Sequence, residues 1–214
     1  MTSTSTFSLV FALALLMGLG AKLWLASRQI RHVAAHRGQV PSAFVEAISL
    51  SAHQKAADYT VAKSRLGLLE LAYGAALLLG WTLLGGLDFL NQWLLQWMEG
   101  GMAQQLALLI SFAVIGGVLD LPFTLYQTFV IEERFGFNKM TWKLWLTDAA
   151  KGAVLGALIG LPIAWVVLWL MGAAGGLWWL WAWGLWRAFH LLLLVGYRTL
   201  MARLRNEFES VRHA

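Results

Sequence analysis

Long apolar stretches separated by short polar segments dominate this sequence. The hydrocarbon core of a bilayer is about 30 Å thick, and roughly 20 residues of α-helix are needed to cross it. The stretches that meet this requirement are residues 7–25, 66–84, 105–129, 144–171 and 178–200. The pattern therefore predicts an all-α, polytopic membrane protein with five transmembrane helices.

A long polar extension precedes the second span. Residues 41–65 contain His53, Lys55 and Asp58, and neither Gly nor Pro interrupts residues 42–66. Because Gly and Pro are the residues that most often end a helix, we expect the extension to continue into the span as one rod. Part of this rod should project into the cytoplasm.

Two further features modify the simple picture of straight spans. The third span carries Gly116, Gly117 and Pro122, where we expect the helix to kink or to become thin. Between the second and third spans, apolar residues recur at helical spacing, which predicts a short helix lying in the membrane interface. These residues are Leu90, Trp93, Leu94 and Trp97.

The basic residues indicate an orientation. The chain has 16 Lys and Arg residues, and all but Arg187 lie in residues 22–65, 134–151 and 198–212. The connections at residues 85–104 and 172–177 contain no Lys or Arg. Short loops rich in Lys and Arg stay on the cytoplasmic side of a membrane. We therefore expect the N-terminus outside and the C-terminus inside, in the cytoplasmic (inner) membrane of a bacterium.

Composition supports a membrane protein and excludes other classes. Hydrophobic residues make up 59% of the chain and charged residues 13%, with a mean hydropathy of +0.65, which exceeds what a soluble domain of this size carries. The net charge of +5 could indicate nucleic-acid binding, but the basic residues flank apolar spans and form no continuous stripe. We therefore predict no nucleic-acid partner. The absence of Cys excludes disulfides and thiolate metal sites.

One pair of histidines has a spacing suited to metal. His32 and His36 would share a helix face, but the residues between them are Val33, Ala34 and Ala35. The pair therefore lacks both a third ligand and the Glu that acts as general base in the H-E-x-x-H motif. We interpret it as a solvated helix surface.

The ionisable residues deepest in apolar surroundings are Asp120 and Arg187. A lone charge in hydrocarbon costs about 2.5–3.5 kcal/mol, so each should face a partner or a water-filled cavity. A structural pair of Asp120 with Arg187 is the simplest hypothesis, ahead of a catalytic or proton-relay role. Glu70 and His190 are candidates for the same polar interior.

Two sequence motifs carry a family resemblance. Residues 121–141 read L-P-F-T-L-Y-Q-T-F-V-I-E-E-R-F-G-F-N-K-M-T, and residues 53–63 read H-Q-K-A-A-D-Y-T-V-A-K. Both segments, and about residues 28–204 as a whole, resemble the M48 family of zinc metallopeptidases of the CAAX prenyl protease type. The residues that carry the match are Glu132, Glu133, Arg134, Gly136, Asn138, Lys139 and Thr141 in the first motif and His53, Gln54, Lys55, Asp58 and Tyr59 in the second.

The chemistry of the first motif fits a structured polar loop. Glu132, Glu133 and Arg134 bring opposite charges together near two helix ends. Gly136 suits a turn, and Asn138 is able to cap the following helix. The resemblance implies that this loop packs beneath a metalloprotease domain and helps to enclose a chamber within the membrane.

The resemblance also implies what this segment does not supply. In the family, the zinc-binding H-E-x-x-H lies downstream of the fifth helix, and no H-E-x-x-H occurs in these 214 residues. We therefore expect no cofactor and no peptide hydrolysis from this chain alone. Residues 1–204 would form the membrane domain, and residues 205–214 the charged start of the catalytic region. The implied partners are the bilayer, a downstream metallopeptidase domain and a peptide or prenylated protein substrate.

Two interpretations stay open. In the first, the chain is the membrane-embedded N-terminal half of a zinc-dependent CAAX-type endopeptidase. In the second, it is a stand-alone membrane scaffold or interaction protein derived from that family. A transporter is disfavoured because the sequence shows neither the broken helices nor the repeat symmetry typical of transporters.

Overall fold

The structure is a computed structural model that describes the backbone of residues 3–211 and the side chains of residues 5–192, 194 and 195. These residues form helices of three kinds and no strand. Elements η1 and η3 are 3-10 turns, and η2 is a π-helix. In chain order the elements are α1 (Ser3–Ala35), η1 (Ser42–Phe44), α2 (Leu50–Thr82), α3 (Gly86–Leu95), α4 (Met102–Tyr126), η2 (Gln127–Glu132), α5 (Trp142–Ala173), η3 (Gly175–Leu177) and α6 (Trp178–Val211).

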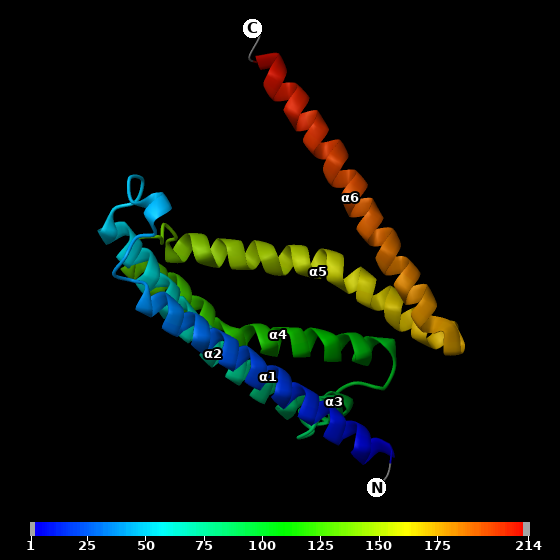
Figure 1. The fold of residues 1–214 in the computed structure, drawn as a ribbon. Coiled ribbons are helices and arrows are strands. Elements are labelled where there is room, and N and C mark those ends of the chain that lie inside the picture. The colour runs from blue at the N-terminus through cyan, green and yellow to red at the C-terminus, as the bar shows by residue number, and fades with distance from the viewer. Residues whose placement is uncertain (1–2, 212–214) are drawn as a thin grey trace. The chain divides into compact units, whose positions relative to one another are not determined.

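The chain divides into two compact units. The first comprises Met1–Glu99 with Ala107–Ala150, and the second comprises Gly100–Leu106 with Lys151–Ala214. In the first unit, α1 and α2 lie side by side and run in opposite directions, and α2 also packs against α3 and η2 (Figure 1). In the second unit, η3 packs against α6.

Helix lengths exceed what a bilayer requires. Both α1 and α2 have 33 residues, which at 1.5 Å per residue corresponds to roughly 50 Å, against a hydrocarbon core of about 30 Å. Both helices are therefore long enough to extend beyond the membrane, as predicted for the polar extension before the second span.

Within the described residues, three helical stretches are long and apolar enough to span a membrane: Ser5–Ala35, Met102–Glu132 and Trp142–Ala173. A fourth results if Leu50–Thr82 and Gly86–Leu95, which meet at a bend of 51°, are counted as one broken span. The most apolar windows of the first three have no buried residue, so their side chains face outward. Outward apolar side chains are what lipid contact requires, and the predicted all-α polytopic membrane fold is confirmed.

The fifth predicted span lies in α6, which is less apolar than the three stretches above. The first half of α6 is rich in Trp, whose indole ring carries a polar N–H group, and it also contains Arg187 and His190. These residues lower its hydropathy although the helix is long enough.

One detail of the predicted helices needs correction. The rod before the second span begins at Leu50 and not at Ser42, because Ser49 caps it: the Ala52 N–H donates to Ser49 Oγ over 3.2 Å. In the third span, Pro122 lies inside α4 and the π-helix η2 follows it, and the kink or thinning near Gly116, Gly117 and Pro122 stays a prediction.

The short helix predicted between the second and third spans is present as α3, and its location in the membrane interface stays a prediction. Its left-handed N-cap is Gly85, with φ of +81°, a conformation that favours glycine. Leu90 and Leu94 are buried, whereas Trp97 is 75% exposed. The helix therefore packs one apolar face against the protein and leaves Trp93 exposed, and Trp97 follows its C-terminal end.

Candidate functional site

The two motifs contact each other in the first unit. The Tyr59 ring on α2 meets two aromatic rings that follow η2, with centroid distances of 5.5 Å to Phe135 and 4.9 Å to Phe137, both edge to face. Leu66, Ile131 and Phe135 are buried together beside Tyr59. We call these five side chains the motif cluster: Tyr59, Leu66, Ile131, Phe135 and Phe137. The motif cluster fixes the loop after η2 to the first half of α2.

The loop after η2 turns where the sequence predicted. Gly136 has φ of +71°, and its N–H donates to the Glu133 carbonyl over 2.9 Å. The Phe137 N–H donates to the Glu132 carbonyl over 2.8 Å. Lys55 Nζ lies 5.5 Å from the centre of the Phe137 ring, within reach of a cation–π interaction. The turn therefore folds Phe137 back onto α2.

Polar side chains stabilise the same loop. Gln127 Nε2 donates to Glu132 Oε1 over 3.5 Å, at the long limit of a hydrogen bond. Asn138 Nδ2 donates to Glu133 Oε2 over 3.0 Å, and Asn138 Oδ1 accepts from the Met140 N–H over 2.7 Å. These contacts give the motif glutamates fixed partners.

The predicted cap of the next helix was assigned to the wrong residue. Helix α5 begins at Trp142, so its N-cap position is Thr141, whose Oγ accepts from the Leu144 N–H over 3.2 Å. Asn138 lies too early in the chain for that position and instead closes the loop. Lys139 beside it is exposed.

The second motif also connects α2 to the end of α1. Arg37 forms a bidentate ion pair with Asp58, with Nε to Oδ1 at 2.7 Å and Nη2 to Oδ2 at 2.8 Å. The hydrogen bond from Arg37, together with the positive charges of Arg37 and Arg134, holds the pKa of Asp58 below its usual value. His53 Nε2 lies 3.1 Å from the His36 carbonyl, and Gln54 is half-buried beside it in sequence.

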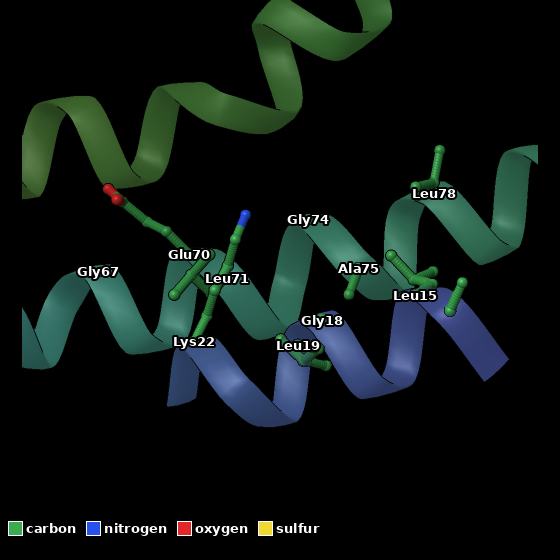
Figure 2. A pocket seen from close by; sticks show the side chains of 11 residues that line it. Leu15, Gly18, Leu19, Lys22, Gly67, Glu70, Leu71, Gly74, Ala75 and Leu78 are labelled. Carbon is green, nitrogen blue, oxygen red and sulfur yellow. The ribbon is translucent and has the colours of Figure 1, made fainter. Parts of the chain in front are cut away.

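Glu70 lines a cavity of about 480 Å³ between α1 and α2. Figure 2 shows its side chain and that of Lys22 on the same side of the two helices. Gly18, Gly67 and Gly74 line the same cavity and leave room at the helix surfaces. The sequence made Glu70 a candidate for a polar interior but did not predict that Lys22 lines the same cavity.

Asp120 and Arg187 lie on helices that belong to different units. Asp120 is exposed on α4, where its carbonyl accepts from Thr124 Oγ over 3.2 Å. Arg187 is exposed on α6, with its guanidinium carbon 5.3 Å from the centre of the Trp183 ring. The His190 ring lies 4.8 Å from the Trp186 ring. The pairing of Asp120 with Arg187 stays a prediction.

Comparison with known proteins identifies the family. The sequence model of the family described as "CAAX prenyl protease N-terminal, five membrane helices" matches residues 29–207. This chain belongs to that family. The match includes both motifs and the segments that the motif cluster holds together.

Relatives and a solved structure agree with this assignment. The chain is 36% identical over 110 residues to "CAAX prenyl protease 1 homolog" of Oryza sativa subsp. japonica, a match covering 51% of this chain and 26% of that protein. It is 29% identical over 215 residues to the Homo sapiens homolog, covering 93% and 44%. The crystal structure of S. mikatae Ste24p superposes with a TM-score of 0.79 at 24% identity, covering 86% of this chain and 44% of that one. The chain therefore spans less than half the length of these relatives.

CAAX prenyl proteases of this family are zinc metalloproteases. No group of three or more His, Asp or Glu side chains in the described residues is placed to hold a metal ion. The His32 and His36 rings lie 4.2 Å apart, and His36 Nδ1 lies 2.8 Å from the His32 carbonyl. Such a pair does not fit zinc, because a zinc site needs at least three protein ligands. Whether the chain binds zinc stays a prediction to be measured.

Proposed function

We propose that this chain is the membrane-embedded N-terminal half of a zinc-dependent CAAX-type endopeptidase and encloses a chamber around a catalytic domain that it does not contain. Residues 1–204 serve as the membrane domain, and residues 205–214 begin the catalytic region. The described part of that tail continues α6, and residues 212–214 lie outside the described residues.

The contact between the two family motifs is the observation that supports this proposal. The second motif lies in the first half of α2, where η2 and the turn after it pack against that helix. Within the motif cluster, Ile131 and Phe135 are only 5% and 8% exposed. Polar and charged residues surround this cluster, among them Lys55, Glu133 and Arg134. A rigid apolar support beneath a polar surface suits the docking of a soluble domain. In this role the chain positions the chemistry and supplies none.

The experiment uses this chain extended by the downstream region of a relative that carries H-E-x-x-H. Cleavage of a farnesylated CAAX peptide should fall on the order of tenfold on Phe137→Ala, because the turn after η2 then loses the ring contacts of Phe137 with Tyr59 and Lys55 and keeps only that of Phe135. The matched control is Phe89→Ala, since Phe89 lies on α3 and is 73% exposed. Equal activity of the two variants would remove the motif cluster from the proposal.

The proposed orientation places the N-terminus outside and the charge-rich segments in the cytoplasm. It follows from the distribution of Lys and Arg. Reporter fusions after Leu25, Gly100, Lys139, Ala174 and Met201 should alternate in, out, in, out and in. A cytoplasmic signal at Gly100 would overturn this topology. The matching relatives are eukaryotic, so a bacterial inner membrane rests on the sequence expectation alone.

The stand-alone scaffold is the second candidate function. The coding sequence after Ala214 discriminates the two candidates. An in-frame or frameshifted H-E-x-x-H favours the protease, and a stop codon followed by unrelated sequence favours the scaffold.

A further inference from the structure

A second cavity, of about 400 Å³, lies at the end of α1 and α2 where the charged residues gather. Its charged lining consists of Arg37, Asp58, Arg65 and Arg134. These side chains come from the loop after α1, from α2 and from the turn after η2, all in the first unit. Residues distant in the sequence therefore converge on one basic cavity.

The charges around this cavity are unbalanced. Three guanidinium groups face one carboxylate, which leaves two net positive charges. The bidentate ion pair with Arg37 already occupies both oxygens of Asp58. In the described part of the chain, neither Arg65 nor Arg134 has a carboxylate within ion-pair distance. Both side chains are exposed and accessible to an anion from outside, although Arg134 also lies 5.7 Å from the Phe135 ring and its charge acts on Asp58.

The rest of the lining is apolar. Ala34, Ala57, Val61, Ala62 and Phe135 complete it. Arg65 immediately precedes Leu66, the first residue of the predicted second span, so the cavity lies where the apolar helix surface begins. A ligand that fits must therefore bring an anionic group to the arginines and apolar groups toward the membrane.

We propose that this cavity binds the phosphate headgroup of an anionic phospholipid. Arg presents a planar fork of donors that matches phosphate oxygens, and it is the residue of choice for phosphate recognition. Basic pockets between membrane helices on the cytoplasmic side bind anionic lipid headgroups elsewhere. The lipid glycerol and chains lie beyond Arg65, along the α2 surface that begins at Leu66. The site is independent of the protease proposal and requires no downstream domain.

The affinity test uses the purified 214-residue chain in detergent and native mass spectrometry. Phosphatidylglycerol is titrated against phosphatidylcholine, and glycerol phosphate is the soluble arm. Each Lys or Arg near a membrane surface contributes about 1 kcal/mol to anionic lipid binding. The double variant Arg65→Gln with Arg134→Gln should therefore weaken phosphatidylglycerol binding by about thirtyfold, and each single variant by about fivefold.

The matched control is Arg28→Gln with Arg31→Gln, which removes the same charge from α1 outside the cavity. Retained phosphatidylglycerol binding in the control supports the proposal. Equal loss in both double variants means a general surface-charge effect and overturns it. So does equal affinity for phosphatidylcholine, or binding of glycerol phosphate as tight as that of the lipid, which would make the cavity a site for soluble anions.

A second measurement avoids substitutions altogether. A photoactivatable phosphatidylglycerol is irradiated with the unmodified chain, and the labelled peptides are mapped. With the reactive group on the headgroup, label should concentrate in the two segments that contribute most of the cavity lining, at Ala57, Asp58, Val61, Ala62 and Arg65 and at Arg134 and Phe135. Label spread along the lipid-facing surface of α5, with none at these residues, overturns the proposal.

Discussion

Replacing Phe135 with Ala is expected to destabilise the first unit by about 3 kcal/mol. Phe135 is 8% exposed and lies between Tyr59, Leu66 and Ile131. A buried aromatic side chain covers about 150–250 Å², which corresponds to about 4–6 kcal/mol of transfer free energy. Ala retains part of this area. Measured Phe→Ala costs in protein cores are about 3–5 kcal/mol, and we take the lower end because the adjacent turn can relax into the space.

We expect the hydrophobic effect to apply here because the rings of the motif cluster lie at the ends of the predicted spans, where charged side chains gather. Lys55, Lys63 and Arg134 lie 5.5–5.8 Å from these rings. Side chains between helices inside a bilayer gain little from burial, because lipid is equally apolar. A loss as large as that of a soluble core would therefore place the rings on the water side.

Denaturant-induced unfolding of the purified chain in detergent, followed by Trp fluorescence, measures this loss. The control is Phe89→Ala, which removes the same side chain at a position 73% exposed and should change the free energy of unfolding by less than about 0.5 kcal/mol. Equal losses for the two variants would refute the assignment of a water-side core to the motif cluster.

Three further outcomes are expected. The depressed pKa of Asp58 adds to the free energy of unfolding above the unfolded pKa of about 4, and this contribution should be lost as the pH falls through the lower pKa of the folded state. Asp58→Asn lacks this contribution, so its stability should depend less on pH in this range. Identical pH profiles of unfolding for the two proteins would contradict this. Gly136→Ala should cost about 1–2 kcal/mol for the left-handed φ of +71°, whereas Gly38→Ala, which meets no atom within 4 Å, should not. Asp120→Ala and Arg187→Ala should each destabilise more than the double variant, and additivity in the cycle excludes their pairing.

Local patterns predicted the helices because hydropathy and Gly placement act over a few residues. These patterns predicted the long helices, the short helix α3 and the turn at Gly136. The cap of α5 was assigned to Asn138 and not to Thr141 because the first residue of a helix cannot be read from the sequence to within three positions.

The long-range contacts could not be predicted from the same patterns. Arg37 and Asp58 are 21 residues apart and meet because α1 packs along α2. Tyr59 stood out as part of a motif, but its ring partners Phe135 and Phe137 follow from the turn after η2. The π-helix η2 has no sequence signature that we can identify. Packing between helices therefore decided most of the candidate site.

The most direct test of the central claim measures zinc content and peptide cleavage. Both are compared between the isolated chain and the same chain extended by a segment that carries H-E-x-x-H. The account predicts no stoichiometric zinc and no cleavage of a farnesylated CAAX peptide by the 214 residues, because the pair His32 and His36 lacks a third ligand and a general base. The extended chain should gain both properties. One equivalent of zinc in the isolated chain, lost on replacing His32 and His36 by Ala, would contradict the account and make the pair a metal site.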